Sequence, residues 1–251
     1  MFREYFILLL LGHVLGDFYI QTEKMAERKE KSIKWLLLHC LLYWGVLLLI
    51  GLPLLSLRII LGATLAAGFH FLIDIFKYIF MLYKKPGASN LPAFHRNVFI
   101  LDQLSHAFCL IGIAYWFATN HVALYEVEFI KDFFRTIGVS EILILKWLLA
   151  LLLIHKPANI AISKLLLIYK PEDNNEDKMQ DHNAGRLIGT VERIIMLIFL
   201  SIGQYSAIGL VLTAKSIARY DKISKEKNFA EYYLLGTLIS TVMVIVVSFV
   251  L

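Results

Sequence analysis

Long apolar runs recur along this chain and constrain its fold more than any other feature of the sequence. Residues 35–57, 57–80 and 229–251 each reach or approach the roughly 20 residues that a helix needs to cross a bilayer. Hydrophobic residues make up 59% of the 251 and charged residues only 18%, which is too apolar a balance for one soluble core. The sequence therefore predicts an all-α, polytopic helical bundle in a membrane.

The first apolar run, residues 5–20, is expected to be a retained helix rather than a signal peptide. No small-residue cleavage site follows it, whereas a strongly charged loop does. The net charge of +5 does not indicate nucleic-acid binding, because the basic residues are divided among short loops beside the apolar runs. The distribution of these basic residues among the loops indicates instead which side of the membrane each loop faces.

Basic residues predict the topology through the positive-inside rule. The third loop contains Lys84, Lys85 and Arg96, and the first loop is richer still in lysine and arginine. Both loops are therefore expected on the cytoplasmic side, with the amino terminus outside. The basic residues of the first loop are Lys24, Arg28, Lys29, Lys31 and Lys34.

The second half of the chain begins with a fifth predicted span. This span covers residues 141–155 and is expected to end before Pro157, because proline lacks the backbone N–H that an interior helical turn uses. Residues 158–169 then form a short helix along the cytoplasmic surface. The polar residues 171–183 are expected to form a cytoplasmic loop.

The last third contains one apolar stretch, residues 187–214, that is interrupted at Gly203. A hairpin of two short helices around this glycine keeps the following basic residues, beginning with Lys215 and Arg219, on the cytoplasmic side. This arrangement gives about eight membrane segments, and a single crossing gives seven as the alternative. All of them are expected to belong to one integral-membrane domain, residues 1–251.

Histidines and aspartates recur inside the apolar runs at a spacing of four residues. Residues four apart share one face of an α-helix, about 6 Å apart along the axis, so each pair has the geometry to hold one ion. Ionisable side chains inside spans are costly and mark functional sites. The three pairs and one further histidine are His13 and Asp17, His70 and Asp74, Asp102 and His106, and His39.

These seven side chains are predicted to lie at similar depths. Counted at ~1.5 Å per residue from the nearest basic loop residue, all fall in the cytoplasmic half of the first four spans. Imidazole and carboxylate are ligands for zinc, manganese and iron. We therefore predict a divalent metal site built from these seven residues, with zinc as the first expectation. A structural network of mutual hydrogen bonds is the alternative.

Polar residues near this set are candidates for catalysis and substrate binding. One of Asp17, Asp74 and Asp102, if it is not a ligand, is the candidate general base. Lys77 and Arg96 are candidates for binding an anionic headgroup at the cytoplasmic mouth of the site. Ordinary snorkelling of these two side chains to the membrane surface is the alternative.

Four further residues have side chains whose roles can be interpreted from the sequence. Glu192 and Arg193, near the start of the sixth segment, are a candidate catalytic base and a candidate anion-binding residue, or else a local ion pair. Gln103 is expected to contact a neighbouring helix, because it points about 100° away from Asp102. Cys40 is interpreted as a small buried hydrophobic residue.

Several strings in the sequence resemble one family. They are GHVLGDFYIQTEKMAERK, LLLHCLLY and HFLID in the first half, and AGRLIGTVERIIM, GQYSAIGLVLTAKSIARY and AEYYLLGTLIS in the second. The chain resembles the bacterial membrane family known as domain of unknown function 3307. The resemblance implies a bacterial inner-membrane protein and assigns no catalytic residue. A looser likeness is to predicted membrane-bound metal-dependent hydrolases.

Three functions are consistent with the sequence. The first is an intramembrane metal-dependent hydrolase acting on a membrane lipid or a lipid-linked phosphate. The second is a transporter of metal ions or of protons coupled to a solute. The third is a membrane scaffold or interaction subunit whose basic loops dock a soluble cytoplasmic partner. Nucleic acid is not an expected partner, and the oligomeric state is left open.

Overall fold

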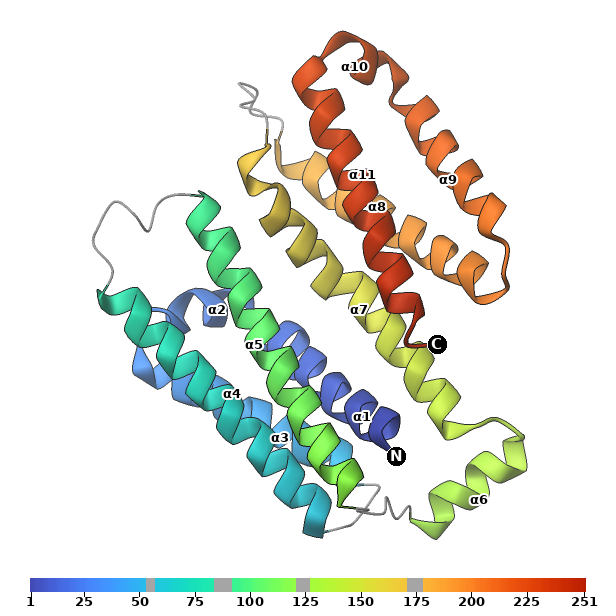
Figure 1. Cartoon of the computed structure of the whole chain (residues 1–251). Coiled ribbons are helices and arrows are strands. Elements are labelled where there is room, and N and C mark those ends of the chain that lie inside the picture. Colours follow the sequence, from blue (N-terminus) through green and yellow to red (C-terminus); the bar gives the residue numbers. More distant parts are fainter. Residues whose placement is uncertain (53–56, 84–91, 121–126, 171–177) are drawn as a thin grey trace. The chain divides into compact units, whose positions relative to one another are not determined.

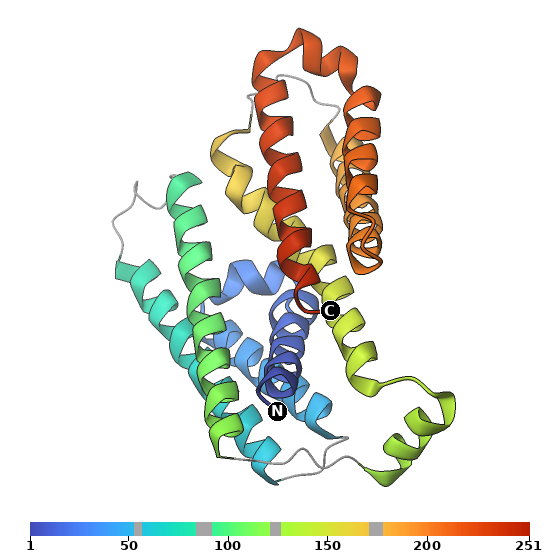
Figure 2. The same ribbon diagram turned by 45° about the vertical axis from the view of Figure 1, so that its right-hand side comes forward.

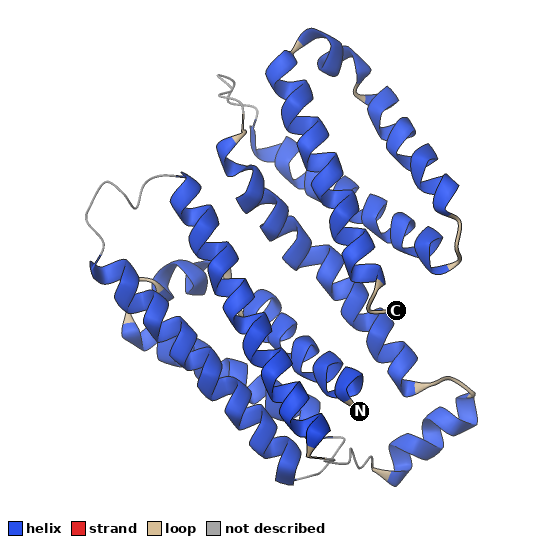
Figure 3. Cartoon of the chain, viewed as in Figure 1, coloured by secondary structure: helices blue, strands red, loops and turns tan. Residues whose placement is uncertain are grey.

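The computed structural model describes residues 1–52, 57–83, 92–120, 127–170 and 178–251, with only the backbone for residues 178–184. Within these ranges every regular element is a helix, which confirms the predicted all-α class (Figure 1, Figure 3). The helices form two compact units, Met1–Leu149 and Ala150–Leu251, and each is described by itself. That they make up one membrane domain stays a prediction.

Unit 1 contains the first four apolar runs of the sequence. Its first helix changes to π-helical geometry for its last six residues, and the π-helix contains Asp17. The elements are α1 (Phe2–Val14), the π-helix η1 (Leu15–Ile20), α2 (Glu23–Lys29), α3 (Ile33–Gly51), α4 (Leu57–Tyr83), α5 (Pro92–Thr119), α6 (Glu128–Ile137) and the start of α7 (Glu141–Leu165).

Unit 2 contains the predicted hairpin around Gly203. Gly203 has a left-handed backbone with φ of 72°, which glycine adopts without a steric penalty, and two helices that pack on each other flank it. The helix before it begins inside the predicted polar loop 171–183. The elements are the rest of α7, α8 (Lys178–Ser201), α9 (Tyr205–Ala218), α10 (Tyr220–Lys225) and α11 (Lys227–Ser248).

The predicted count of eight membrane segments is not supported. Among the described residues, five helices are long and apolar enough to span a membrane, or six if α1, η1 and α2 form one bent span. The apolar part of α8 carries Arg186, Glu192 and Arg193, which is too many charges for a simple span. With 14 residues, α9 extends only about 21 Å and is shorter than a bilayer core.

The prediction that a span ends before Pro157 is wrong. The helix α7 continues through Pro157 to Leu165, and a 3₁₀ turn extends it to Ile168, so the separate surface helix over residues 158–169 is absent. Pro157 lacks the N–H that would bond the carbonyl oxygen of Leu153, four residues earlier. At the adjacent position, the Nε of Arg193 donates to the carbonyl oxygen of Ile154 at 2.7 Å, so a side chain from α8 contacts the backbone of α7 beside the proline.

The break between η1 and α2 turns the chain through 96°. Gln21 has an extended backbone, and Thr22 then caps α2 by accepting a hydrogen bond from the backbone N–H of Met25 at 3.2 Å. Met25 and Lys29 lie four residues apart on α2, and both are buried. This short helix therefore directs a lysine into the protein rather than into solvent.

The four long helices of unit 1 pack around one apolar core. The helix α1 packs on α3 and α5, and α4 packs between α3 and α5; Figure 2 shows these four running alongside one another. Their core includes Tyr5, Leu9, Leu47, Ala114 and Phe117. Burial of these side chains fixes how each helix is rotated, and hence where its histidine and aspartate point.

Some sequence predictions lie outside the described residues. These are the basic loop at Lys84 and Lys85 and residues 171–177 of the polar loop. The orientation of the chain in the membrane and the position of its amino terminus therefore remain predictions.

Gly16 is expected to be intolerant of any side chain. A Cβ atom there would lie 2.5 Å from Cδ2 of the buried Tyr43 ring, which stacks on His70 at 3.8 Å and has little room to move. We expect Gly16→Ala to destabilise the protein by about 1–3 kcal/mol, measured by thermal unfolding in detergent. The control is Gly45→Ala, where a Cβ meets nothing within 4 Å. Equal melting temperatures for the two variants would contradict this packing.

Candidate metal centre

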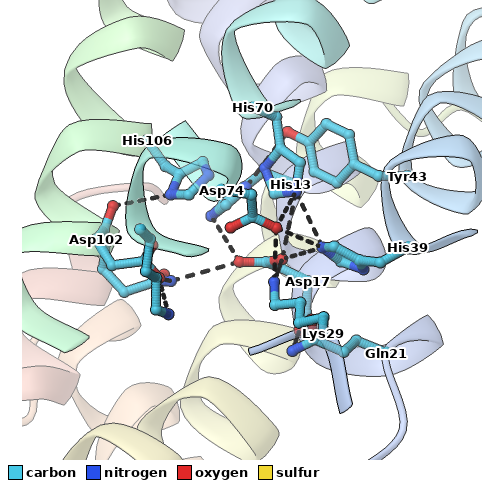
Figure 4. A network of polar contacts seen from close by, with 12 residues as sticks. His13, Asp17, Gln21, Lys29, His39, Tyr43, His70, Asp74, Asp102 and His106 are labelled. Atoms are coloured by element: carbon cyan, nitrogen blue, oxygen red, sulfur yellow. Dashed lines mark hydrogen bonds and ion pairs between the residues drawn. The ribbon is translucent and has the colours of Figure 1, made fainter. Parts of the chain in front are cut away.

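The seven predicted histidines and aspartates lie together in one buried region of unit 1 (Figure 4). Each has at most 9% of its surface exposed. They come from the end of α1, from η1, and from α3, α4 and α5, so the region forms only when these helices pack. His13, Asp17, His39, His70, Asp74, Asp102 and His106 make up this His/Asp cluster.

Three members of the cluster form a first metal-type triad. The Nε2 atom of His39 lies 3.1 Å from Oδ1 of Asp17 and 3.0 Å from Nε2 of His70, and the last two atoms are 3.7 Å apart. Ligands held tetrahedrally at zinc-ligand distances lie about 3.3 Å from one another. The three donor atoms thus already have close to the mutual spacing that one small divalent ion requires.

A second triad lies next to the first. Asp74, Asp102 and His106 each offer one donor atom, and these atoms all lie within 4.8 Å of one another. The rings of His70 and His106 are 4.5 Å apart, which shows how close the triads are. Oδ2 of Asp74 also faces the first triad, at 3.4 Å from Nε2 of His39 and 3.6 Å from Nε2 of His70.

Cys40 is buried, as expected from the sequence, but it also lies near the site, and His13 lies outside the groups of close donor atoms. The Sγ of Cys40 lies within 4.8 Å of donors on His70 and Asp74, so this thiol is a further possible ligand rather than only an apolar side chain. His13 is in none of these groups. Its Nε2 is 4.0 Å from Oδ2 of Asp17, and its Nδ1 is 3.3 Å from the hydroxyl of Tyr43.

Lys29 is the most important site residue that the sequence did not predict. Its Nζ donates to Oδ2 of Asp74 at 2.8 Å and lies 3.9 Å from Oδ1 of Asp17, and the residue is only 7% exposed. In the sequence it was counted among the basic residues of a cytoplasmic loop. The signal that points inward is its spacing of four from Met25, which places an apolar residue and this lysine on one face of α2.

Two uncharged residues hold the cluster in place. The ring of Tyr43 stacks on the imidazole of His70 with planes 4° apart. The amide of Gln103 donates to Oδ2 of Asp17 at 3.4 Å and to Oδ2 of Asp102 at 3.3 Å, so it joins η1 to α5. Gln103 contacts a neighbouring helical element, η1, as expected from the sequence. The residue that it contacts there, Asp17, belongs to the His/Asp cluster.

The three carboxylates are alike in the contacts of one oxygen and differ in those of the other. In each, Oδ2 accepts a hydrogen bond, from Gln103 or Lys29. The buried Oδ1 atoms of Asp74 and Asp102 accept no hydrogen bond, whereas Oδ1 of Asp17 has a close contact, at 3.1 Å from Nε2 of His39. A buried oxygen without a partner is unfavourable unless a proton, a water molecule or an ion completes it. The pattern fits carboxylates that are oriented through one oxygen and bind a cation through the other.

The net charge of the site also favours a bound cation. Nζ of Lys77 lies 3.3 Å from Oδ2 of Asp102, so Lys77 joins Lys29 as the second ammonium group beside the three carboxylates. With all three carboxyl groups ionised and the histidines neutral, one negative charge remains. Burying such a charge in an apolar bundle is costly unless it is paired. The sign of this charge favours a cation, and the ligand types favour a divalent one.

The other predicted site residues have different surroundings. Arg96, on α5, is half-buried and donates to the side chain of its neighbour Asn97. Glu192 and Arg193 belong to unit 2, where Glu192 accepts a hydrogen bond from Lys215 at 2.6 Å. Arg193 is buried, and besides Ile154 it bonds the side chains of Asn159, Thr190 and Ser240. Arg193 thus ties α7, α8 and α11 together, and Glu192 and Arg193 are not paired with each other.

An apolar cavity lies in the same four-helix bundle, toward the other end of its helices. It is lined by residues such as Leu9 of α1, Leu47 of α3, Ile59 of α4 and Phe117 of α5. On each helix these positions are separated from the His/Asp cluster by one to three turns. The His/Asp cluster therefore extends from one end of the bundle to about its middle, and the lining of the cavity beyond it is apolar.

Removing the buried ammonium of Lys29 should destabilise the protein. Because Asp74 and Asp17 would lose their nearest positive charge, we expect Lys29→Met to cost about 3–5 kcal/mol in thermal unfolding experiments. Zn²⁺ should then raise the melting temperature of this variant more than that of the wild type, because an ion replaces the lost charge. The control is Lys24→Met, at an exposed position of the same helix. The two methionine variants having the same stability would contradict the assignment.

The chain can be compared with known proteins once this geometry is clear. A family model described as "Protein of unknown function (DUF3307)" matches residues 5–132, just over half of the chain. No curated protein and no solved structure gives a significant match. The matched range includes the entire His/Asp cluster, Lys29 and Lys77, and it ends before the strings of the second half that also suggested this family. The chain therefore belongs to the DUF3307 family, whose function is unknown.

Proposed function

We propose that this protein is an intramembrane metal-dependent hydrolase that holds a divalent ion between Asp17, His39 and His70. The observation that carries the proposal is the mutual spacing of the three donor atoms, 3.0 to 3.7 Å, in a fully buried setting. Oδ1 of Asp17 supports it as well, because this buried oxygen faces the nitrogens of both histidines, at 3.1 Å from His39 and 3.7 Å from His70. His13 supports the triad from outside it, through its contact with Tyr43.

Zinc is the ion that this ligand set favours. Two histidines and one carboxylate are the protein ligands of several catalytic zinc sites, in which a fourth position is left for water or substrate. The same ligand types also suit iron and manganese, so the metal content of the purified protein decides among them. Cys40 adds a soft ligand near His70, which favours zinc over manganese.

Hydrolysis would use the neighbouring side chains in distinct roles. A divalent ion supplies Lewis-acid activation of water and of a phosphoryl or carbonyl oxygen. Oδ2 of Asp74 faces the triad and is placed to accept a proton from the attacking water. The water oxygen would form the new bond to phosphorus or carbon, the ester bond would break, and the proton held by Asp74 would pass to the leaving oxygen. Lys29 compensates the charge of Asp74 throughout.

The expected substrate is a membrane lipid or a lipid-linked phosphate. The cluster lies within helices that are apolar enough to span a membrane, so a substrate reaches it most directly from the bilayer. Lys77, at the edge of the cluster with 17% of its side chain exposed, is placed to attract an anionic headgroup, and Arg96 lies further along α5. We also propose that the protein lies in a bacterial inner membrane, with this site toward the cytoplasm and the amino terminus outside.

A transporter of protons or metal ions is the second candidate. The contact that favours it is the one between Nε2 of His39 and Nε2 of His70 at 3.0 Å, because two imidazole nitrogens at that distance share one proton. Transport requires access from both sides of a membrane, whereas the interior beyond Tyr43 is the apolar cavity described above. One-sided polarity therefore supports the enzyme over the transporter.

Changing the triad should remove metal and turnover together. Protein purified without a polyhistidine tag is expected to lose triad-bound zinc in His70→Ala and Asp17→Asn, measured by elemental analysis. Phosphate release from phosphatidic acid in mixed micelles should fall at least about 100-fold. His95→Ala, which changes a half-buried histidine of α5, serves as the control.

Two results would contradict the enzyme. Undiminished metal binding in His70→Ala and Asp17→Asn would refute the triad as the metal site. Metal-dependent ion flux in reconstituted vesicles, without turnover of any phospholipid tested, would favour the transporter instead. The His39 and His70 variants would then be expected to lose flux.

A further inference from the structure

His106 is held in the orientation and tautomer of a metal ligand. Its Nδ1 lies 2.8 Å from the backbone carbonyl oxygen of Asp102, and because a carbonyl only accepts, this nitrogen carries the hydrogen. In the neutral ring the lone pair is then on Nε2. That nitrogen is buried and has no hydrogen-bond partner in the described structure, and the residue is 2% exposed. An N–H bonded to a backbone carbonyl is the support that metal-binding histidines usually have.

Asp74 and Asp102, which share a group of close donor atoms with His106, each have one unpartnered oxygen. Lys29 occupies Oδ2 of Asp74, and Lys77 and Gln103 both contact Oδ2 of Asp102. The Oδ1 atoms of both residues are buried without a hydrogen bond. Three adjacent residues on α4 and α5 therefore each present one unsatisfied ligand atom, and the residues offer donor atoms within 4.8 Å of one another.

We propose that Asp74, Asp102 and His106 form a second divalent cation site, so that the protein holds two ions side by side. The inference rests on the proposed function in one respect, because the first ion is the one assigned to Asp17, His39 and His70. Asp74 connects the two sites: Oδ1 is the ligand of the second ion, while Oδ2 remains directed toward the first triad. Lys29 and Lys77 stay on the Oδ2 atoms and do not compete for the ligand positions.

Two neighbouring ions narrow the class of substrate. Pairs of ions about 3.5–4 Å apart are used by enzymes that hydrolyse phosphate esters, because they stabilise both the attacking and the leaving oxygen. The 4.5 Å separation of the His70 and His106 rings is compatible with neighbouring ions. Together with the two lysines, this favours a phosphate ester of a membrane lipid over a carboxylic ester.

The test is to count bound ions in wild type and in variants of one triad at a time. Tag-free protein in detergent is freed of metal with a chelator, loaded with Mn²⁺, and desalted. Metal is then measured by elemental analysis and by electron paramagnetic resonance, which detects spin coupling between adjacent ions. The second-site variants are His106→Phe, which keeps the volume of the ring, and Asp102→Asn, which keeps the shape of the side chain. The first-site variant is His39→Phe, and the control is His95→Phe.

The expected result is two coupled Mn²⁺ ions per chain in wild type and in His95→Phe, and one uncoupled ion in His106→Phe. Asp102→Asn should show the same loss, so the result stands even if one of the variants does not fold. Two ions in folded His106→Phe and Asp102→Asn would overturn the second site.

The outcomes also separate this inference from the proposed function. One ion in wild type that survives His106→Phe but is lost in His39→Phe would overturn the second site and leave the first intact. One ion with the opposite dependence would support the second site and overturn the first. A wild type that binds no Mn²⁺ or Zn²⁺ would overturn both.

Discussion

The constraint on which this structure depends is the burial of ionised groups among helices that are otherwise apolar. Three carboxylates lie inside unit 1, and an unpaired charge there would make the bundle unstable. The protein meets part of this requirement with two lysines, one glutamine and three imidazoles that contact the carboxylate oxygens, and one negative charge remains for a bound cation. The packing of α1, α3, α4 and α5 and the contacts of the cluster therefore depend on each other. Rotation of one of these helices would separate a buried carboxylate from side chains that contact it.

The sequence was informative where a single helix determines the answer. Long apolar runs predicted helices, and the spacing of four in His70 and Asp74 predicted that the two side chains share a face, which the 3.6 Å contact bears out. That spacing says nothing about how one helix is rotated against another. The shortest contacts of the first triad join His39, Asp17 and His70, which come from three different elements. His13 lies four residues before Asp17 in the sequence, but its nearer nitrogen contact with that carboxylate is 4.0 Å, and it is not part of the triad.

The failures of sequence reasoning have identifiable physical causes. Lys29 was assigned to a loop because composition cannot show that the chain turns by 96° after η1. The span at Pro157 was ended too early because helix α7 continues through the proline, where it contacts Arg193 from a helix far along the chain. The count of eight segments assumed that apolar length was sufficient, whereas α8 carries three charges in that length and α9 is short. The first two errors concern a partner distant in sequence, whereas the third concerns charge and length within the segments themselves.

The turn into α2 ties a local backbone feature to the charge balance of distant helices. Lys29 reaches Asp74 on α4 from a seven-residue helix whose first turn is capped by Thr22. A change at this cap or at the 96° turn before it would therefore act on a buried carboxylate more than forty residues away in sequence, although neither Thr22 nor Gln21 contacts Asp74.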